Sequence, residues 1–168
     1  MDHVILVDEH DIEQSALEKL EAHRQGLLHR AFSVLIFDTN GRMLLQKRAL
    51  SKYHSAGLWT NACCSHPRPM ENTKSAAERR LKEEMGIQCD LDWFFSFRYK
   101  IEFDNGLTEN ELDHVFRGVT NQIPLCSPQE VSEWQYLDME SLNLRMRESP
   151  NEFTHWFHLI MQKLNKEK

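Results

Sequence analysis

A thiol, an imidazole and two alternating carboxylates give this chain side chains for proton transfer and for metal binding. Cys64 and His66 lie in the run 59–67, and Glu109 and Glu111 follow in a Glu-Asn-Glu triplet. On a strand, residues two apart point to the same face, so each pair would present its side chains together. Such a set can bind a hard or borderline metal and leave the cysteine free to react.

Composition argues against several other classes of protein. The 168 residues include 20 Lys and Arg against 26 Asp and Glu, without a dominant basic stripe, which argues against nucleic-acid binding. No apolar run approaches the roughly 20 residues of a membrane-spanning helix, and the N-terminal segment is too short and acidic for a signal peptide. The four cysteines lack the spacing of a zinc ribbon or a disulfide framework. We expect one domain over residues 1–168, monomeric and cytoplasmic, with reduced thiols.

The elements that must position these residues are a mixture of strands and helices. Apolar runs bounded by turn residues predict strands near 4–7, 31–37, 42–48, 59–66, 94–103, 111–120 and 134–136. An Asn40-Gly41 turn joins the second and third of these strands as a hairpin. Helices are predicted at 13–24 and at 73–85, the second with Gly86 as its C-terminal cap. A capping box at 149–152, with proline at the first helical position, predicts the start of a last helix.

The helix predicted at 73–85 places an ion pair beside its apolar stripe. Relative to Ala77 at about 100° per residue, Leu81 lies at about +40°, Glu84 at about −20° and Arg80 at about −60°. On an arbitrary helix, the Arg80–Glu84 pair would be a surface contact worth about 0.3–0.5 kcal/mol. The residues around this pair form a longer motif, which suggests a role in binding instead.

The run from Ser65 to Ile87 resembles the Nudix box, a loop-helix-loop motif. Five residues follow Ser65, then Glu71, seven more residues and Arg-Arg-Leu-Lys-Glu-Glu-Met-Gly-Ile. Two positions depart from the motif, because Ser65 replaces a glycine and Arg80 replaces the first glutamate of an Arg-Glu pair. In Nudix hydrolases that glutamate helps to hold the magnesium used to cleave a diphosphate. A cation at this position removes a ligand and repels the metal, which argues against hydrolysis.

Further motifs resemble the type 1 isopentenyl-diphosphate isomerases, the Nudix-fold branch that moves a double bond. They are, in chain order, His23 and His29, residues 47–52, the Gly-x-Trp-Thr-Asn-x-x-Cys-x-His-Pro run at 57–67, Phe97-Arg98-Tyr99, and Glu109-Asn110-Glu111. The resemblance covers about residues 4–156, and the long run and the Glu-x-Glu pair are highly specific when they occur in this order. It implies an α/β fold, a Nudix-like α/β/α sandwich with a mixed sheet. It also implies interconversion of isopentenyl and dimethylallyl diphosphate.

That reaction adds a proton to an unactivated alkene and removes one from the neighbouring carbon, through a carbocation-like state. It requires an acid and a base on opposite faces of the substrate, a dry pocket and a group that stabilises positive charge. By resemblance, Cys64 and Glu111 transfer the protons, and Tyr99 assists Glu111. The ring of Trp156 would cover the pocket and stabilise the cation. The sequence leaves open which of Cys64 and Glu111 donates.

The resemblance also implies two metal ions and a phosphate site, with a small prenyl diphosphate as the partner. One divalent metal, Zn²⁺, Mn²⁺ or Mg²⁺, would be held by three imidazoles and two carboxylates, those of His23, His29, His66, Glu109 and Glu111. A Mg²⁺ ion bound to the diphosphate would contact Glu84. The phosphates themselves would contact four cations, Lys19, Arg48, Lys52 and Arg80.

Two other functions stay open at this point. One is a Nudix hydrolase of diphosphate substrates, which Arg80 argues against. The other is a non-catalytic metal-binding protein, which would have no need of Cys64. Single histidines such as His54, His155 and His158 are interpreted as surface or core residues. Cys63 is expected to face away from Cys64 and to pack in the core.

Overall fold

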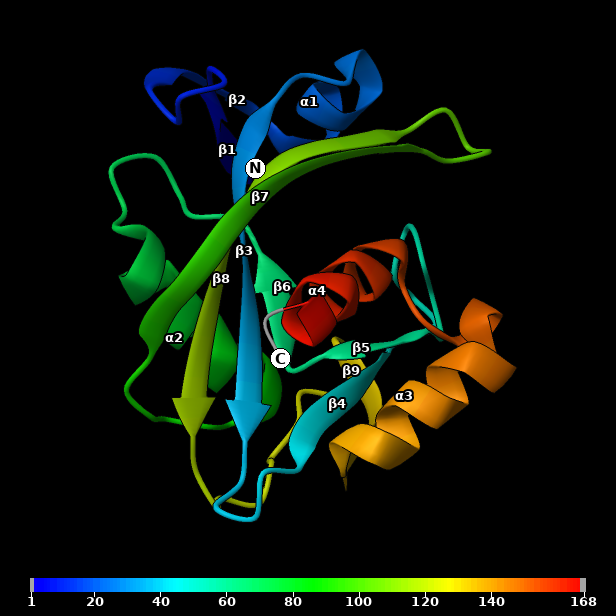
Figure 1. The fold of residues 1–168 in the computed structure, drawn as a ribbon. Helices are drawn as coiled ribbons and strands as arrows, with labels where there is room; N and C mark the ends of the chain where they lie inside the picture. The colour runs from blue at the N-terminus through cyan, green and yellow to red at the C-terminus, as the bar shows by residue number, and fades with distance from the viewer. Residues whose placement is uncertain (1, 167–168) are drawn as a thin grey trace.

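A mixed sheet forms the centre of the molecule, with helices on both of its faces (Figure 1). The computed structural model describes residues 2–166; position 1 and the last two positions of the predicted domain lie outside the described residues. The described strands are β1 (His3–Val7), β2 (Glu13–Glu18), β3 (His29–Phe37), β4 (Met43–Arg48), β5 (Trp59–Asn61), β6 (Cys63–Ser65), β7 (Asp92–Glu102), β8 (Thr108–Val119) and β9 (Val131–Leu137). The helices are α1 (Lys19–Gln25), α2 (Thr73–Met85), α3 (Met139–Glu148) and α4 (His155–Lys166), with a 3₁₀ turn at Pro150–Glu152. None of the helices in residues 2–166 is long and apolar enough to cross a membrane.

Strand β3 pairs with the strands that carry most of the candidate functional residues. It runs parallel to β8 along its whole length and antiparallel to β1, β4 and β6. The parallel register sets His29 opposite Glu111. The antiparallel register with β6 sets Ser33 opposite Cys64. The site therefore depends on pairing between segments that are far apart in the sequence.

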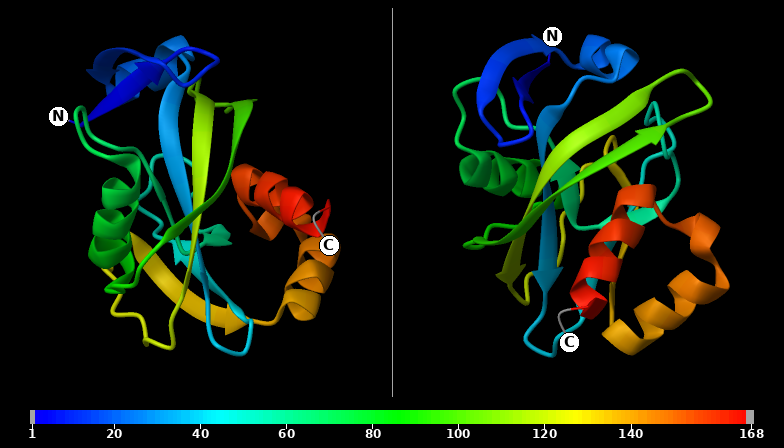
Figure 2. Two further views of the ribbon diagram at one scale, coloured as in Figure 1. Left: turned by 60° about the vertical axis from the view of Figure 1, so that its left-hand side comes forward. Right: turned by 45° about the horizontal axis from the view of Figure 1, so that its top comes forward.

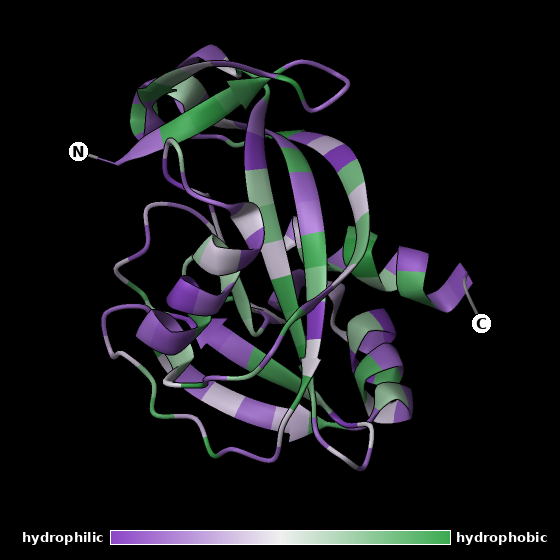
Figure 3. Ribbon diagram, turned by 90° about the vertical axis from the view of Figure 1, so that its left-hand side faces the viewer, coloured by the Kyte–Doolittle hydropathy of each residue, from purple (hydrophilic) through white to green (hydrophobic). Residues whose placement is uncertain are grey.

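Two hydrophobic clusters lie on opposite faces of the sheet. Helix α2 packs on one face, where Leu81 and Met85 meet inward side chains such as Val34. Helices α3 and α4 cover the other face, where Phe157 and Ile160 are fully buried. Figure 2 shows α2 and the α3–α4 pair on the two sides of the central strands. In Figure 3, hydrophobic bands run along those strands, as expected for a sheet that is covered on both faces. This arrangement confirms the predicted α/β sandwich with a mixed sheet.

Helix α2 has the boundaries that the sequence predicted. The side chain of Asn72 caps its start by accepting from the backbone N–H of Ser75. Gly86 ends it in the left-handed conformation, at φ 67°. A side chain at Gly86 would also meet the backbone oxygen of Leu125 at 2.7 Å, so both conformation and space require glycine.

The helix predicted at 13–24 is wrong in its first half. Residues 13–18 form β2, which pairs antiparallel with β1. Helix α1 begins only at Lys19, because the carboxylate of Glu18 accepts from the backbone N–H groups of Leu20 and Glu21 and so caps it. The late start places His23 near the end of a two-turn helix.

The helix predicted to begin at Ser149 is also wrong at its start. Residues 150–152 form one 3₁₀ turn without a side-chain cap, and α4 begins at His155. The sequence did not predict α3, which precedes this turn. A residue of α3 bonds to the two groups that a capping box would join to each other, the Ser149 N–H and the Glu152 carboxylate. The backbone N–H of Ser149 bonds to the carbonyl of Arg145 at the end of α3, and the Arg145 guanidinium binds the Glu152 carboxylate at 2.9 Å.

Candidate active site

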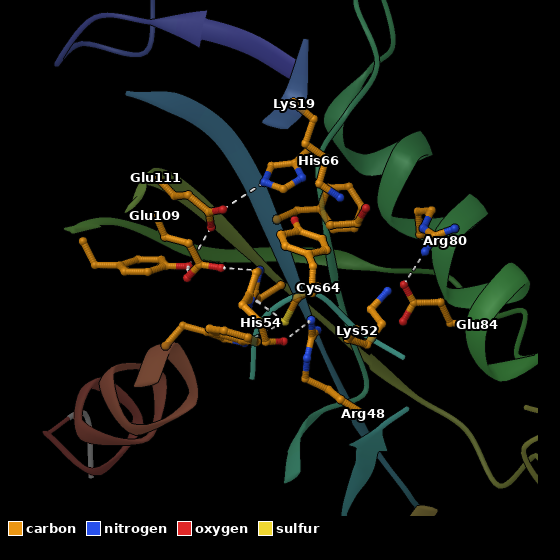
Figure 4. A pocket seen from close by; sticks show the side chains of 16 residues that line it. Lys19, Arg48, Lys52, His54, Cys64, His66, Arg80, Glu84, Glu109 and Glu111 are labelled. Atoms are coloured by element: carbon orange, nitrogen blue, oxygen red, sulfur yellow. Dashed lines mark hydrogen bonds and ion pairs between the residues drawn. The ribbon is translucent and has the colours of Figure 1, made fainter. Parts of the chain in front are cut away.

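One pocket gathers almost all of the predicted functional residues (Figure 4). Its lining includes the predicted proton-transfer residues, the four predicted phosphate-binding cations, Trp156, Glu84, Glu109 and His66. His23 and His29 are fully buried and lie behind this lining. Their ring centroids are 5.6 and 5.0 Å from that of His66.

Three imidazoles and one carboxylate converge on a common point. The ligand atoms of His23, His29, His66 and Glu111 all lie within 4.8 Å of one another. The Nε2 atom of His66 is 2.8 Å from Oε1 of Glu111, and that of His29 is 3.4 Å from the same oxygen. Burial would raise the pKa of the Glu111 carboxyl, but the neighbouring imidazoles of His29 and His66 outweigh it and hold that pKa well below its usual range.

The tautomers of the two buried histidines fit a metal site. Nδ1 of His23 lies 2.6 Å from the carbonyl of Lys19, and Nδ1 of His29 lies 2.8 Å from that of Leu27. A carbonyl can only accept, so each Nδ1 carries a proton, and in the neutral ring, the form that binds a metal, each Nε2 presents a lone pair. Both Nε2 atoms are buried without a hydrogen-bond partner. A backbone carbonyl that fixes the tautomer of a histidine is the usual support of a metal ligand, and a His₃Glu set suits zinc or manganese.

Glu109 lies outside this group of four. Its Oε1 is 3.0 Å from Nε2 of His54, and its Oε2 is 3.1 Å from the hydroxyl of Tyr99. The Tyr99 hydroxyl also lies 2.7 Å from Oε2 of Glu111, so it connects the two carboxylates. Burial, together with the charge of Glu111, raises the pKa of Glu109 well above its usual range. The pair therefore divides into an ionised Glu111 and a Glu109 that retains its proton more strongly.

His54 is a member of the pocket that the sequence analysis assigned to the surface or the core. Its side chain is only 7% exposed, and its ring stacks on Phe103 and meets Trp156 edge-on, at centroid distances of 5.1 and 5.9 Å. Burial first, and then the charge of Arg48, lower the pKa of His54 to about 3. The available signal was its place two residues after Lys52, just beyond the segment 47–52 that carries two of the predicted phosphate-binding cations.

Three side chains surround the sulfur of Cys64. The indole N–H of Trp156 donates to Sγ at 3.1 Å, Oδ1 of Asn61 lies at 3.1 Å and Oγ of Ser33 at 3.4 Å. The amide group of Asn61 donates to the carbonyls of Val34 and Cys63, so its oxygen must face the sulfur and accept from the thiol. Burial, followed by the charge of Asp113, raises the pKa of the Cys64 thiol to about 12. Within the pocket, Cys64 is therefore a protonated thiol of fixed orientation.

Asp113 is a buried carboxyl that continues the alternation of Glu109 and Glu111 along β8. It is 1% exposed and accepts from the Ser33 hydroxyl at 2.7 Å, while its Oδ1 has no partner. Burial, followed by the charge of Glu111, raises its pKa from 3.8 to about 8. Residues two apart on a strand point to the same face, so the alternation that selects Glu109 and Glu111 also selects Asp113.

We expect Asp113→Asn to stabilise the protein at alkaline pH. A carboxyl whose pKa is raised in the folded state holds its proton more tightly when folded, so stability falls as pH rises from about 4 to about 8. The amide cannot ionise, and the free energy of unfolding at pH 9 should exceed that of the wild type by about 1–3 kcal/mol. Urea unfolding at pH 5 and pH 9 measures this, with Asp104→Asn in an exposed turn as the control. An equal difference at both pH values would contradict the prediction.

Cations from three segments meet on the other side of the pocket. Arg80 lines it from α2, and its guanidinium donates to Glu83, Glu84 and Glu130 at 2.7, 2.6 and 3.3 Å. The predicted proximity of Arg80 and Glu84 is thus confirmed, but Glu84 is buried instead of lying on the surface. Gln46 from β4 bonds to the other oxygen of Glu84 at 3.0 Å. The position that carries a glutamate in the Nudix box therefore holds a guanidinium among carboxylates.

Two further predicted cations have contacts in the pocket. The guanidinium of Arg48 lies over the ring of Trp156, 5.3 Å from its centroid, and donates to the carbonyl of His54. Lys19 is held at the pocket by α1, and burial, followed by the charge of Lys52, lowers its pKa. Trp156 thus contacts both the cation of Arg48 and the thiol of Cys64.

Comparison with known proteins agrees with this geometry. A model of the NUDIX domain matches residues 27–157. Isopentenyl-diphosphate Delta-isomerase 1 of Aromatoleum aromaticum is 54% identical over 150 residues, which cover 89% of this chain and 85% of that protein. This chain belongs to the isopentenyl-diphosphate Delta-isomerase family. Another member, from Pectobacterium atrosepticum, is 50% identical over 147 residues, 88% of this chain and 82% of that protein.

Solved structures share the architecture of this isomerase family member. DR0079 from Deinococcus radiodurans superimposes with a TM-score of 0.79 at 17% identity, over 96% of this chain and 98% of that one. A MutT protein from Methanosarcina mazei gives a TM-score of 0.68 at 19% identity, over 83% and 94% of the two chains. At such identities the likeness concerns the fold alone. The sequence resemblance to the isomerases, with the departure at Arg80, separates this chain from proteins that share only its architecture.

Proposed function

We propose that this chain interconverts isopentenyl and dimethylallyl diphosphate by protonating one carbon of the prenyl group and deprotonating another. The observation that carries the proposal is a pocket that holds a partly buried thiol, a carboxylate bound by a tyrosine, and a group of cations. The thiol is Cys64 on β6, and the carboxylate is Glu111 on β8 with Tyr99 on β7. The high identity to isopentenyl-diphosphate Delta-isomerases supports the same reaction.

The two proton-transfer groups differ in their environment, which suits a reaction that needs an acid and a base at once. Cys64 holds a proton strongly, and Glu111 is ionised. One of them delivers a proton to the alkene and the other removes one from the neighbouring carbon, so that the substrate gains and loses one proton in each turnover. Tyr99 holds Oε2 of Glu111 at 2.7 Å and fixes the direction of its lone pairs. The indole of Trp156 lies beside the sulfur, where its π-face can stabilise positive charge on the prenyl group.

The diphosphate would be bound by the cations of the pocket, namely Lys19, Arg48, Lys52 and Arg80. Glu84 would share a Mg²⁺ ion with the diphosphate oxygens. This use of Arg80 replaces hydrolytic metal chemistry by phosphate binding, because its guanidinium occupies the position of a metal-binding glutamate.

A divalent cation would be held by His23, His29, His66 and Glu111, whose ligand atoms converge. Glu109 would join this set only by giving up its contact with His54. When bound, the metal would supply positive charge that lowers the proton affinity of Glu111. A monomeric state and a cytoplasmic location remain predictions from the sequence.

Incubation with isopentenyl diphosphate and Mg²⁺ in deuterated water tests the proposal. We expect deuterium in a methyl group of dimethylallyl diphosphate, detected by NMR, without release of phosphate. Release of phosphate or pyrophosphate would instead indicate a hydrolase. Neither product would indicate a non-catalytic metal-binding protein, and both of these outcomes overturn the proposal.

A further inference from the structure

Glu130 occupies the point where the cations of the pocket meet, directly before β9. Its Oε1 accepts from the guanidinium of Arg80 at 3.3 Å, and its Oε2 accepts from the ammonium group of Lys52. The two partners come from helix α2 and from the loop after β4. Glu130 also lines the cavity next to the active-site pocket, which shares Lys19, Lys52 and Arg80 with it. None of the sequence motifs includes this carboxylate.

The backbone around Glu130 holds the same loop. The N–H of Ala49 donates to the carbonyl of Glu130 at 3.0 Å, and Arg48 pairs with Val131 across the β4–β9 ladder. Main chain and side chain of Glu130 therefore both fix the segment that carries Arg48 and Lys52. The Glu130 carboxylate joins this segment to α2 through Arg80, which makes it a cross-link between two of the elements that supply cations.

Repulsion between like charges explains why such a cross-link is needed. Like charges that lie close together near a protein surface repel one another, so converging cations tend to separate toward water. The effect is visible at Lys19, whose pKa is lowered by burial and then by the charge of Lys52. Conversely, Lys52 and Arg80 oppose the effect of burial on Glu130 and lower its pKa, so the carboxylate is charged and offsets their repulsion.

We propose that Glu130 is a positioning residue of the diphosphate site, which holds Lys52 and Arg80 in the orientation that receives the diphosphate. The inference rests on the proposed function, because it takes the cations to be the diphosphate site. A site held in its binding geometry before the ligand arrives loses less conformational freedom on binding. The carboxylate would act through the two cations, without contact with the prenyl group or with the groups that transfer protons.

The test compares Glu130→Gln with Glu133→Gln, a matched control on β9 whose partner is Lys47. The two readouts are KM and kcat for isopentenyl diphosphate and, by calorimetry, the Kd of inorganic pyrophosphate with Mg²⁺. For Glu130→Gln we expect KM and this Kd to rise about tenfold, comparable to the loss of one charge-assisted hydrogen bond, with kcat within about twofold. Glu130→Asp should recover part of the affinity, and Glu133→Gln should leave both readouts unchanged.

Four results would overturn the inference. Unchanged pyrophosphate affinity in Glu130→Gln would mean that the carboxylate has no effect on binding. Tighter binding would mean that the carboxylate competes with phosphate for Lys52 and Arg80. A loss of kcat and melting temperature with unchanged KM would mean a purely structural role. The fourth result is a wild-type protein that isomerises its substrate but whose pyrophosphate binding is not weakened by Lys52→Ala. This result would refute the cation site and leave the proposed reaction standing. Absence of isomerisation in the wild type would instead refute the proposed function itself.

Discussion

Replacing Cys64 by alanine is expected to lower kcat for isomerisation by about 10⁴-fold, the upper end of what one positioned proton-transfer group contributes. The thiol is the one titratable group on its strand that lines the pocket, and three side chains fix its direction. A water molecule in its place would lack a covalent link to β6 that fixes the direction of proton transfer. Stopped-time assays with isopentenyl diphosphate and Mg²⁺ measure the loss.

The loss should be confined to proton transfer. Oδ1 of Asn61 keeps the hydroxyl of Thr60 as a donor when the thiol is removed, so the corner between β5 and β6 should persist. We therefore expect pyrophosphate affinity to be within about twofold of the wild type and the melting temperature within a few degrees, about 1 kcal/mol in stability. Cys89→Ala, which removes a partly buried thiol outside the pocket, is the matched control. Near-wild-type turnover by Cys64→Ala would show that the acid–base pair is assigned wrongly.

Local signals predicted the parts of this fold that local interactions determine. Helix α2 begins after an asparagine cap and ends at a glycine with positive φ, and both features are readable from nearest neighbours. The ion pair of Arg80 and Glu84 follows from helical geometry alone. The Asn-Gly turn between β3 and β4 is likewise local, with Gly41 at φ 78°.

Long-range pairing decided the elements that were predicted wrongly. Residues 13–18 are mostly of types that favour a helix, such as Glu, Gln, Ala and Leu, but β1 offers them a ladder partner and they become a strand. The capping box at 149–152 has the right residue types, yet Arg145 from the unpredicted α3 binds Glu152 first. A propensity computed on one segment contains no information about either partner.

The site shows the same division. Cys64, His66 and the Glu-x-Glu pair were predicted because a motif of fixed spacing carries them. His54 and Glu130 lie in irregular segments, and only the tertiary structure brings His54 to Glu109 and Glu130 to Lys52. Single polar residues in loops are usually solvated, so the position of His54 close to Lys52 was only a weak signal, and Glu130 had none.

Replacing Glu111 by glutamine should abolish isomerisation to the same degree and also reduce metal binding. Glu111 is the member of the His₃Glu group that carries negative charge, and its two oxygens have different partners. Oε1 faces the imidazoles of His66 and His29, and Oε2 receives the hydroxyl of Tyr99. A glutamine can present only one oxygen to these two sides and cannot accept a proton from carbon. We expect kcat to fall by about 10⁴-fold and the divalent metal content of protein purified without chelator to fall with it.

Two comparisons separate the proton-transfer role of Glu111 from its metal role. His29→Ala removes a metal ligand that does not line the pocket, so it should reduce metal content while leaving the carboxylate in place. If Glu111 acts only through the metal, the two variants will lose the same activity at equal metal content. If Glu111 also transfers the proton, activity in excess Zn²⁺, Mn²⁺ or Mg²⁺ will return in His29→Ala and not in Glu111→Gln. We expect the second result, because Tyr99 holds Oε2 of Glu111, which is not the oxygen that faces His66 and His29. Restored turnover in Glu111→Gln would mean that Glu111 only binds the metal.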